Sequence, residues 1–174
     1  MARLLDNVIH YVFSVLAVLL ISYLIIAYVG QRTEVIGNSM YPTLENSDQL
    51  IVNKLIYKLS DPKRYDVVVF PCKGEYYVKR VIGLPGETVR INSDGVIFVN
   101  EQVLPDVVGI PQIQDAGVAW ESITLGENEY FVLGDNRNHS SDSRDPSVGN
   151  ISRDLIVGKV SFRVFPLPSI GLVN

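Results

Sequence analysis

The chain has 174 residues, a length that suggests one domain, and 47% of its residues are hydrophobic and 20% charged. These fractions are ordinary for globular proteins and exclude disordered, collagen-like and coiled-coil chains. The single cysteine excludes an internal disulfide and any metal site that needs several cysteines. The net charge of -4, without a block of lysines and arginines, gives no reason to expect nucleic acid as a partner.

The hydrophobic residues are concentrated near the N-terminus, where 8–29 is a stretch of 22 residues without Asp, Glu, Lys or Arg. As a helix it would be about 33 Å long, enough to cross a hydrocarbon core of about 30 Å. Tyr11, Tyr23 and Tyr28 lie near its ends, where aromatic rings prefer the membrane interface. A cleavable signal peptide would have a shorter apolar region, followed by a small-residue cleavage site. A buried core helix is the other alternative, but nearly all faces of this predicted helix are apolar. We therefore predict a membrane-spanning anchor over 8–29.

The charges that flank this stretch barely decide its orientation, because Arg3 precedes it and Arg32 follows it. The short N-terminal segment, 1–7, favours a cytoplasmic location for that end as the simpler arrangement. Membrane lipid is the first partner that the sequence predicts.

The segment after the anchor, 30–174, is long enough for one hydrophobic core and follows a mostly β pattern. Asn92 to Gly95 predicts a hairpin turn, and 55–59 fits a helical turn. The segment 104–120 is rich in Pro and Gly, has no periodicity and is predicted to be a loop. Short apolar runs between turn residues predict strands at 49–53, 66–70, 76–82, 88–91, 95–99, 130–133 and 157–164. We predict a mainly β fold, a compact and largely antiparallel β domain beside the membrane.

The first candidate for chemistry is the segment 37–44, GNSMYPTL, which follows the anchor closely. Gly37 permits close approach of the backbone, and Pro42 fixes the chain after Ser39. Such a segment can present a serine hydroxyl at a site, but it can also be a turn in which Ser39 or Thr43 caps a helix. These residues alone leave both interpretations open.

The predicted strand 76–82 carries two adjacent cations, Lys79 and Arg80. Alternation along a strand puts them on opposite faces, so one of them points where its neighbours are apolar. One interpretation is an edge strand whose lysine and arginine stems lie along the surface. The other is a buried Lys79, because burial can lower a lysine pKa from about 10.4 by about 3 units and leave a neutral amine that accepts a serine proton.

The densest polar segment is 134–146, which holds three serines, three aspartates and two arginines. It directly follows the predicted strand 130–133, and loops that leave core strands commonly carry sites, although a solvated loop has the same composition. His139 is the only histidine after the anchor, which argues against a histidine-based metal site. A Ser-His-Asp triad that uses His139 remains an alternative. Cys72 lies in a turn with no second feature that would make it a nucleophile.

Taken in order, these segments resemble the motifs of bacterial type I signal peptidases, also called leader peptidases. The segment 37–44 is similar to the family's S-M-x-P-T-L nucleophile motif, and 64–70, RYDVVVF, is similar to its R-G-D-V-V-V-F motif. The segment 77–87, YVKRVIGLPGE, matches the lysine motif, and 134–144 resembles G-D-N-R-x-x-S-x-D-S-R. The short chain with one anchor is more similar to Gram-positive members than to the larger two-span enzymes.

The resemblance implies a role for each matching residue. Ser39 would be the nucleophile and Lys79 its general base, while Ser140 would hydrogen-bond the Lys79 amine and orient it. Four charged residues would form ion pairs that shape the site: Asp135, Arg80, Asp142 and Arg144.

The resemblance also bears on the oxyanion hole and the substrate pocket. The Ser39 backbone N–H is the expected first oxyanion donor. In some family members a serine hydroxyl is the second donor, but that position is Gly37 here, so another backbone N–H or water would serve. Met40 and Ile36 are predicted to line the substrate pocket because they neighbour this segment.

The implied function is that of a serine endopeptidase, bound to the cell membrane by one span, which removes signal peptides from secreted preproteins through an acyl-enzyme. The resemblance implies a mainly β fold, a catalytic domain on the extracytoplasmic side, and no cofactor or metal. An extended signal peptide would bind by strand addition.

Two further alternatives stay in view. One is a membrane-anchored, non-catalytic β binding domain or an inactive paralogue. The intact site residues argue against it: Ser39, Lys79, Ser140 and Asp142. The other is a different Ser-Lys enzyme, such as the self-cleaving repressors of the DNA-damage response. The predicted anchor and the lack of a DNA-binding segment argue against that second alternative.

Overall fold

The computed structural model describes residues 2–28 and 30–173. Val29, the predicted last residue of the anchor, lies outside the described residues, as do Met1 and Asn174.

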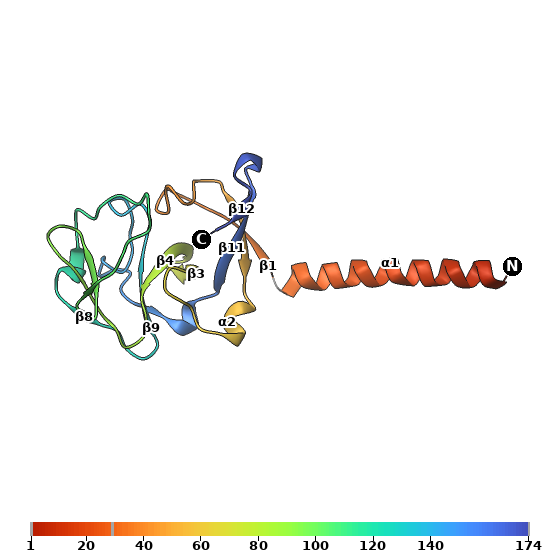
Figure 1. Ribbon diagram of the computed structural model, residues 1–174, viewed down its shortest axis with the longest axis horizontal. Coiled ribbons are helices and arrows are strands. Elements are labelled where there is room, and N and C mark those ends of the chain that lie inside the picture. The colour runs from red at the N-terminus through yellow and green to blue at the C-terminus, as the bar shows by residue number, and fades with distance from the viewer. Residues whose placement is uncertain (1, 29, 174) are drawn as a thin grey trace.

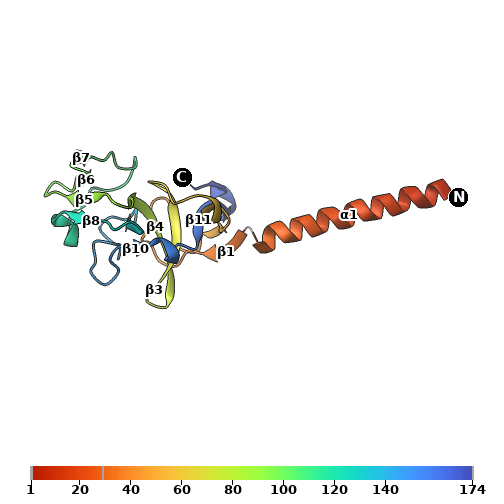
Figure 2. The ribbon, with the colours of Figure 1, turned by 90° about the horizontal axis from the view of Figure 1, so that it is seen from below.

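Helix α1 (Ala2–Tyr28) extends away from the β-rich part of the molecule in both views (Figures 1 and 2). Its side chains from Val8 to Tyr23 are mostly exposed. Among the described residues, no helix is both long and apolar enough to span a membrane.

The described strands form two antiparallel sheets, which confirms the predicted mainly β fold. The larger sheet has the order β1-β2-β11-β3-β4-β9-β10, and β12 pairs with β11. Its strands are β1 (Gly30–Glu34), β2 (Gln49–Asn53), β3 (Val67–Cys72), β4 (Glu75–Gly83), β9 (Glu129–Leu133), β10 (Ile151–Ser152), β11 (Gly158–Phe165) and β12 (Gly171–Leu172). The smaller sheet has the order β7-β6-β5-β8 and lies at the end of the molecule opposite α1 (Figures 1 and 2). Its strands are β5 (Thr88–Ile91), β6 (Ile97–Val99), β7 (Gln102–Val103) and β8 (Ile123–Thr124).

Every predicted strand corresponds to an observed strand, with ends that differ by no more than two residues. Helix α2 (Ile56–Leu59) confirms the predicted helical turn, and Gly95, with φ +69°, lies in the turn of the β5–β6 hairpin. The loop predicted over 104–120 ends in a 3-10 helix, Gly117–Trp120, which the prediction missed. The prediction also missed β1 and the two-residue strands, which have no apolar run of their own.

Strand β3 is buried on both faces, which explains its uninterrupted apolar sequence. Val67 and Val69 pack in one core cluster, together with Met40 of the segment 37–44. Val68 and Phe70 pack in another cluster on the opposite face. Strand β3 is therefore an interior strand of the larger sheet, covered on both faces.

Strand β4 pairs with β3 on one side and with β9 on the other. The edge-strand interpretation of this segment is therefore wrong. Lys79 is 3% exposed and Arg80 is 1% exposed, so the fold buries both cations. Two buried cations on a central strand need compensation by nearby polar groups.

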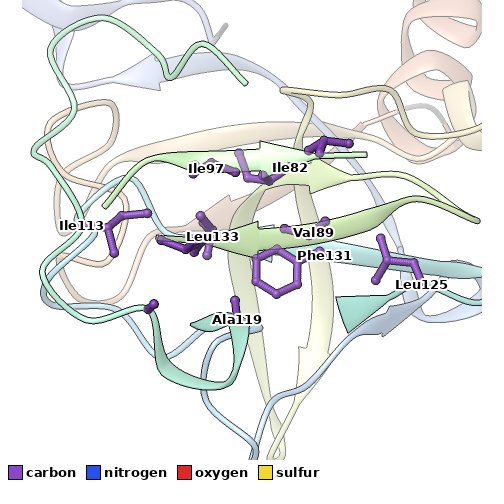
Figure 3. Close-up of a cluster of buried hydrophobic side chains, with 11 residues drawn as sticks. Ile82, Val89, Ile97, Ile113, Ala119, Leu125, Phe131 and Leu133 are labelled. Atoms are coloured by element: carbon purple, nitrogen blue, oxygen red, sulfur yellow. The ribbon is translucent and has the colours of Figure 1, made fainter. Parts of the chain in front are cut away.

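A third core cluster joins the smaller sheet to β9. Figure 3 shows Phe131 and Leu133 of β9 among side chains that include Val89 of β5 and Ile97 of β6. Both β9 residues are fully buried. This packing fixes the end of β9, from which the polar segment 134–146 departs.

Candidate active site

The fold brings Ser39 and Lys79 together from separate elements. Ser39 lies in the segment between β1 and β2, and Lys79 lies on β4. Lys79 Nζ donates a hydrogen bond to Ser39 Oγ at 2.7 Å, across 40 positions of sequence. It also lies 3.1 Å from the carbonyl oxygen of Val78. At this distance a neutral amine can accept the proton of the hydroxyl.

The surroundings of Lys79 favour the neutral amine. Burial lowers the pKa of Lys79 from 10.5 to about 8, because the charged form loses its hydration. The nearby carboxylates of Asp142 and Asp135 act in the opposite direction and limit this decrease. With such a pKa, roughly a tenth of the amine is neutral at pH 7, compared with about one in three thousand for an ordinary lysine.

Gly37 allows an unusual backbone conformation in the segment 37–44. Its φ is +87°, a left-handed conformation that glycine adopts without strain. No atom of the described residues lies within 4 Å of the place a Cβ would take, so the close backbone approach that Gly37 permits is not seen among them. The Gly37 N–H donates to Asn46 Oδ1 at 2.8 Å, which anchors the turn before Ser39.

Gly134, at the end of β9, is where close backbone approach does occur. A Cβ at this position would lie 2.4 Å from the Ser39 carbonyl oxygen and 2.1 Å from Ser140 Oγ. Only glycine fits such a contact. The polar segment 134–146 therefore packs directly against the backbone of Ser39.

Arg80 and Asp135 form the first predicted ion pair, which is bidentate and buried. Arg80 Nε lies 2.9 Å from Asp135 Oδ1, and Arg80 Nη2 lies 2.7 Å from Asp135 Oδ2. The Thr43 hydroxyl donates to the same Asp135 Oδ2 at 2.5 Å. The pair thus links the segment of Ser39, the strand of Lys79 and the polar segment. The sequence suggested only helix capping for Thr43, although it lies within the motif 37–44.

Asp142 and Arg144 form the second predicted ion pair. Arg144 Nε lies 2.8 Å from Asp142 Oδ1, and Arg144 Nη2 lies 2.9 Å from Asp142 Oδ2. Asp142 Oδ2 also accepts the Gly134 N–H at 3.0 Å. The carboxylate therefore closes the polar segment into a loop and holds its start against Ser39.

Ser140 does not make the expected contact. Its Oγ is buried without a hydrogen-bond partner among the described residues, so it does not bond the Lys79 amine in this structure. The reason is its position, because this oxygen packs against Gly134. The neighbouring Ser141 lines the cleft that contains Ser39 and Lys79. The sequence analysis assigned no role to Ser141.

An open cleft of about 470 Å³ contains the side chains of Ser39 and Lys79. Residues 33–36 and 75–79 contribute to its lining together with Ser39 and Ser141. Ile36, which the sequence predicts to contact the substrate, is 88% exposed and lies in this lining. Met40 is instead packed in the core at 1% exposure and does not line the cleft. Backbone segments of this kind can pair with an extended peptide.

The geometry does not assemble a triad around His139. This residue is exposed, and its ring makes no hydrogen bond to a described residue. The Ser39 hydroxyl is bonded by Lys79. The site therefore has the parts for acyl transfer by an amine-activated serine: a nucleophile, a buried amine and a cleft for an extended chain.

The chain is similar to known proteins of one kind. The family model described as "Signal peptidase, peptidase S26" matches residues 8–165. The chain is 35% identical over 156 residues to a probable signal peptidase I-2 of Synechocystis, an alignment that covers 84% of this chain and 68% of that relative. It is 36% identical over 174 residues to signal peptidase I P of Bacillus subtilis subsp. natto, covering 95% of this chain and 93% of that relative. A solved structure of a signal peptidase I from Enterococcus faecalis V583 is 34% identical, with a TM-score of 0.49, and the match covers 59% of this chain and 98% of that one.

Proposed function

Because the chain belongs to the signal peptidase family, peptidase S26, we propose that it removes signal peptides from secreted preproteins with Ser39 as nucleophile and Lys79 as general base. The chain is a serine endopeptidase, as its family membership and its similarity to signal peptidases I indicate. The observation that carries the dyad is the 2.7 Å contact between the buried Lys79 amine and the Ser39 hydroxyl.

The reaction follows from the chemistry of these two groups. Neutral Lys79 accepts the Ser39 proton as Oγ attacks the carbonyl carbon of the scissile peptide bond. The resulting ammonium protonates the leaving amine, the C–N bond breaks, and an acyl-enzyme forms. The amine, neutral again, takes a proton from water, which attacks the ester carbonyl. The C–O bond to Ser39 then breaks, the Lys79 ammonium returns the proton to Ser39 Oγ, and the cleaved signal peptide leaves with a new carboxylate.

The developing oxyanion needs hydrogen-bond donors at about 2.7–3.1 Å. We assign the first to the Ser39 backbone N–H, which donates to no described residue. The Gly37 N–H is engaged by Asn46 and is not available as the second. The direction of the Ser39 N–H depends on the orientation of the peptide group between Asn38 and Ser39. The contacts that hold this peptide group therefore matter for the oxyanion hole.

The substrate is an extended peptide that presents small side chains before the scissile bond. We propose that it lies in the cleft between residues 33–36 and β4, adding backbone hydrogen bonds by strand addition. Ile36 would contact its side chains. Met40, which is packed in the core, would not contact them. We propose that the reaction requires no cofactor or metal.

We further propose that 8–29 is a membrane anchor, with 1–7 in the cytoplasm and 30–174 as the extracytoplasmic catalytic domain. The support is the stretch of 22 residues without Asp, Glu, Lys or Arg. A substrate that is itself inserted in the membrane would then meet an enzyme held at the same surface.

The test is cleavage of a signal peptide with a small-x-small site by the full chain in detergent micelles. Mass spectrometry of the products would locate the cut bond. We expect cleavage by the wild type and by His139→Ala, and loss of cleavage in Ser39→Ala and Lys79→Ala, with all variants folded by circular dichroism. A folded wild type that cuts nothing would instead favour an anchored binding domain.

A further inference from the structure

We propose that Asn136 is a positioning residue for the oxyanion hole, which it serves by holding the peptide groups on both sides of Ser39. This inference rests on the proposed function, because it concerns the N–H assigned as oxyanion donor. Asn136 was not among the residues that the sequence singled out, although it lies in the polar segment 134–146.

Asn136 contacts the nucleophile backbone at two points. Its side-chain Nδ2 donates to the Asn38 carbonyl oxygen at 3.1 Å, across 98 positions of sequence. Its backbone N–H donates to the Ser39 carbonyl oxygen at 3.0 Å. The Tyr41 N–H also donates to the Asn38 carbonyl oxygen, at 3.2 Å. Asn136 thus holds the carbonyl groups of both Asn38 and Ser39.

The Asn38 carbonyl and the Ser39 N–H belong to the same peptide group. This group is planar and trans, so its C=O and N–H bonds point in opposite directions. Fixing the carbonyl toward Asn136 therefore aims the Ser39 N–H away from Asn136. A hydrogen bond to the carbonyl also polarises the peptide group and strengthens its N–H as a donor.

Asn136 is itself held firmly in place. Asp135, the residue before it, is locked in the buried ion pair with Arg80. The Asn136 carbonyl accepts the His139 N–H at 2.9 Å. The Asn136 side-chain amide therefore lies on a fixed loop and can restrain the Asn38–Ser39 peptide group.

Such a contact acts on the transition state more than on substrate binding, because the oxyanion forms only after Ser39 attacks. Loss of the Asn136 amide would let the peptide group rotate and misalign its N–H. Loss of an oxyanion donor costs about 100-fold or more in kcat, so we expect a misaligned donor to cost about tenfold.

The test compares Asn136→Ala and Asn136→Asp with Asn138→Ala in the full chain. Asn138 is a matched control, because its amide ties the same loop to the Gln112 carbonyl at 3.0 Å and to the Gln114 N–H at 2.9 Å. The measurements are kcat, KM, their pH dependence, and inhibition by a peptide aldehyde, whose hemiacetal with Ser39 places an oxygen in the oxyanion hole.

For Asn136→Ala we expect kcat to fall about tenfold, KM to stay within about twofold, and aldehyde affinity to fall in parallel with kcat. Asn136→Asp should lose more, because its carboxylate would face the Asn38 carbonyl. Asn138→Ala should keep near wild-type values, and no variant should shift the pH midpoint that reports Lys79. Equal effects of the two alanine variants, or a rise in KM alone, would overturn the role of Asn136. If the wild type cleaved no signal peptide, the proposed function would fail and this inference with it.

Discussion

The amine of Lys79 and the hydroxyl of Ser39 lie 2.7 Å apart, and the amine is buried at 3% exposure. The burial has a chemical consequence, because it brings the Lys79 pKa down to about 8. The charges that oppose this shift, on Asp142 and Asp135, are each paired with an arginine. The ion pairs therefore hold the loop around the dyad without restoring the ordinary lysine pKa.

Replacing Thr43 with valine should reduce activity through the Asp135 contact. The change keeps the shape of the side chain but removes the hydroxyl that donates to Asp135 Oδ2. We expect the free energy of unfolding to fall by about 1 kcal/mol, and kcat to fall several-fold. Thr43→Ser should restore both, and a Thr43→Val enzyme with wild-type kcat would show that the hydroxyl does not position the nucleophile segment.

Asp135→Asn should be strongly destabilising. It leaves the buried Arg80 charge without its carboxylate, a change that costs about 3–5 kcal/mol in other proteins. Urea unfolding of the two chains would measure the difference.

The matched control is Asp61→Asn, which removes a salt bridge from Arg153 at 3.0 Å with Asp61 at 81% exposure. Exposed pairs of this kind contribute less than about 1 kcal/mol. Similar losses in the two variants would mean that the Arg80–Asp135 pair is no more important to the fold than a surface pair.

Lys79→Met should stabilise the protein at neutral pH while abolishing cleavage. Below pH 8 the lysine is charged in both the folded and the unfolded states, so the folded state carries the full cost of burying the charge. That cost disappears between pH 8 and 10.5, where the unfolded chain binds the proton more tightly. At pH 7 we expect the methionine variant to be more stable by on the order of 2 kcal/mol, after allowing for the lost hydrogen bond to Ser39.

Urea unfolding at pH 7 and at pH 10.5 would measure this difference. The wild type should gain stability as the pH rises through this range, and the variant should lack that gain. A variant less stable than the wild type at pH 7 would contradict a burial cost at Lys79.

The sequence predicted the parts of this molecule that depend on local pattern. The apolar runs of β3 and β4 predicted strands, and the motifs around Ser39 and Lys79 predicted two groups that the fold brings into contact. The pairing of Arg80 with Asp135 and of Asp142 with Arg144 was also expected from the resemblance.

The contacts that the sequence did not predict depend on how distant segments pack. Thr43 meets Asp135 across 92 positions, and Asn136 meets Asn38 across 98, so neither contact leaves a local pattern. The packing of Ser140 against Gly134 likewise depends on how the loop 134–146 folds back. Strand β1 was missed because its polar residues are ordered by pairing with β2, and pairing is a tertiary property.

The most direct test of the dyad is the pH dependence of kcat/KM for signal-peptide cleavage, measured from about pH 5 to 10 with the wild type and His139→Ala. Only the neutral amine is a base, so the rate should rise with pH through a midpoint near 8, the pKa of Lys79, with the same profile in both proteins. A rate that is flat over this range, or a midpoint near 6.5 that disappears in His139→Ala, would contradict a Ser39–Lys79 mechanism.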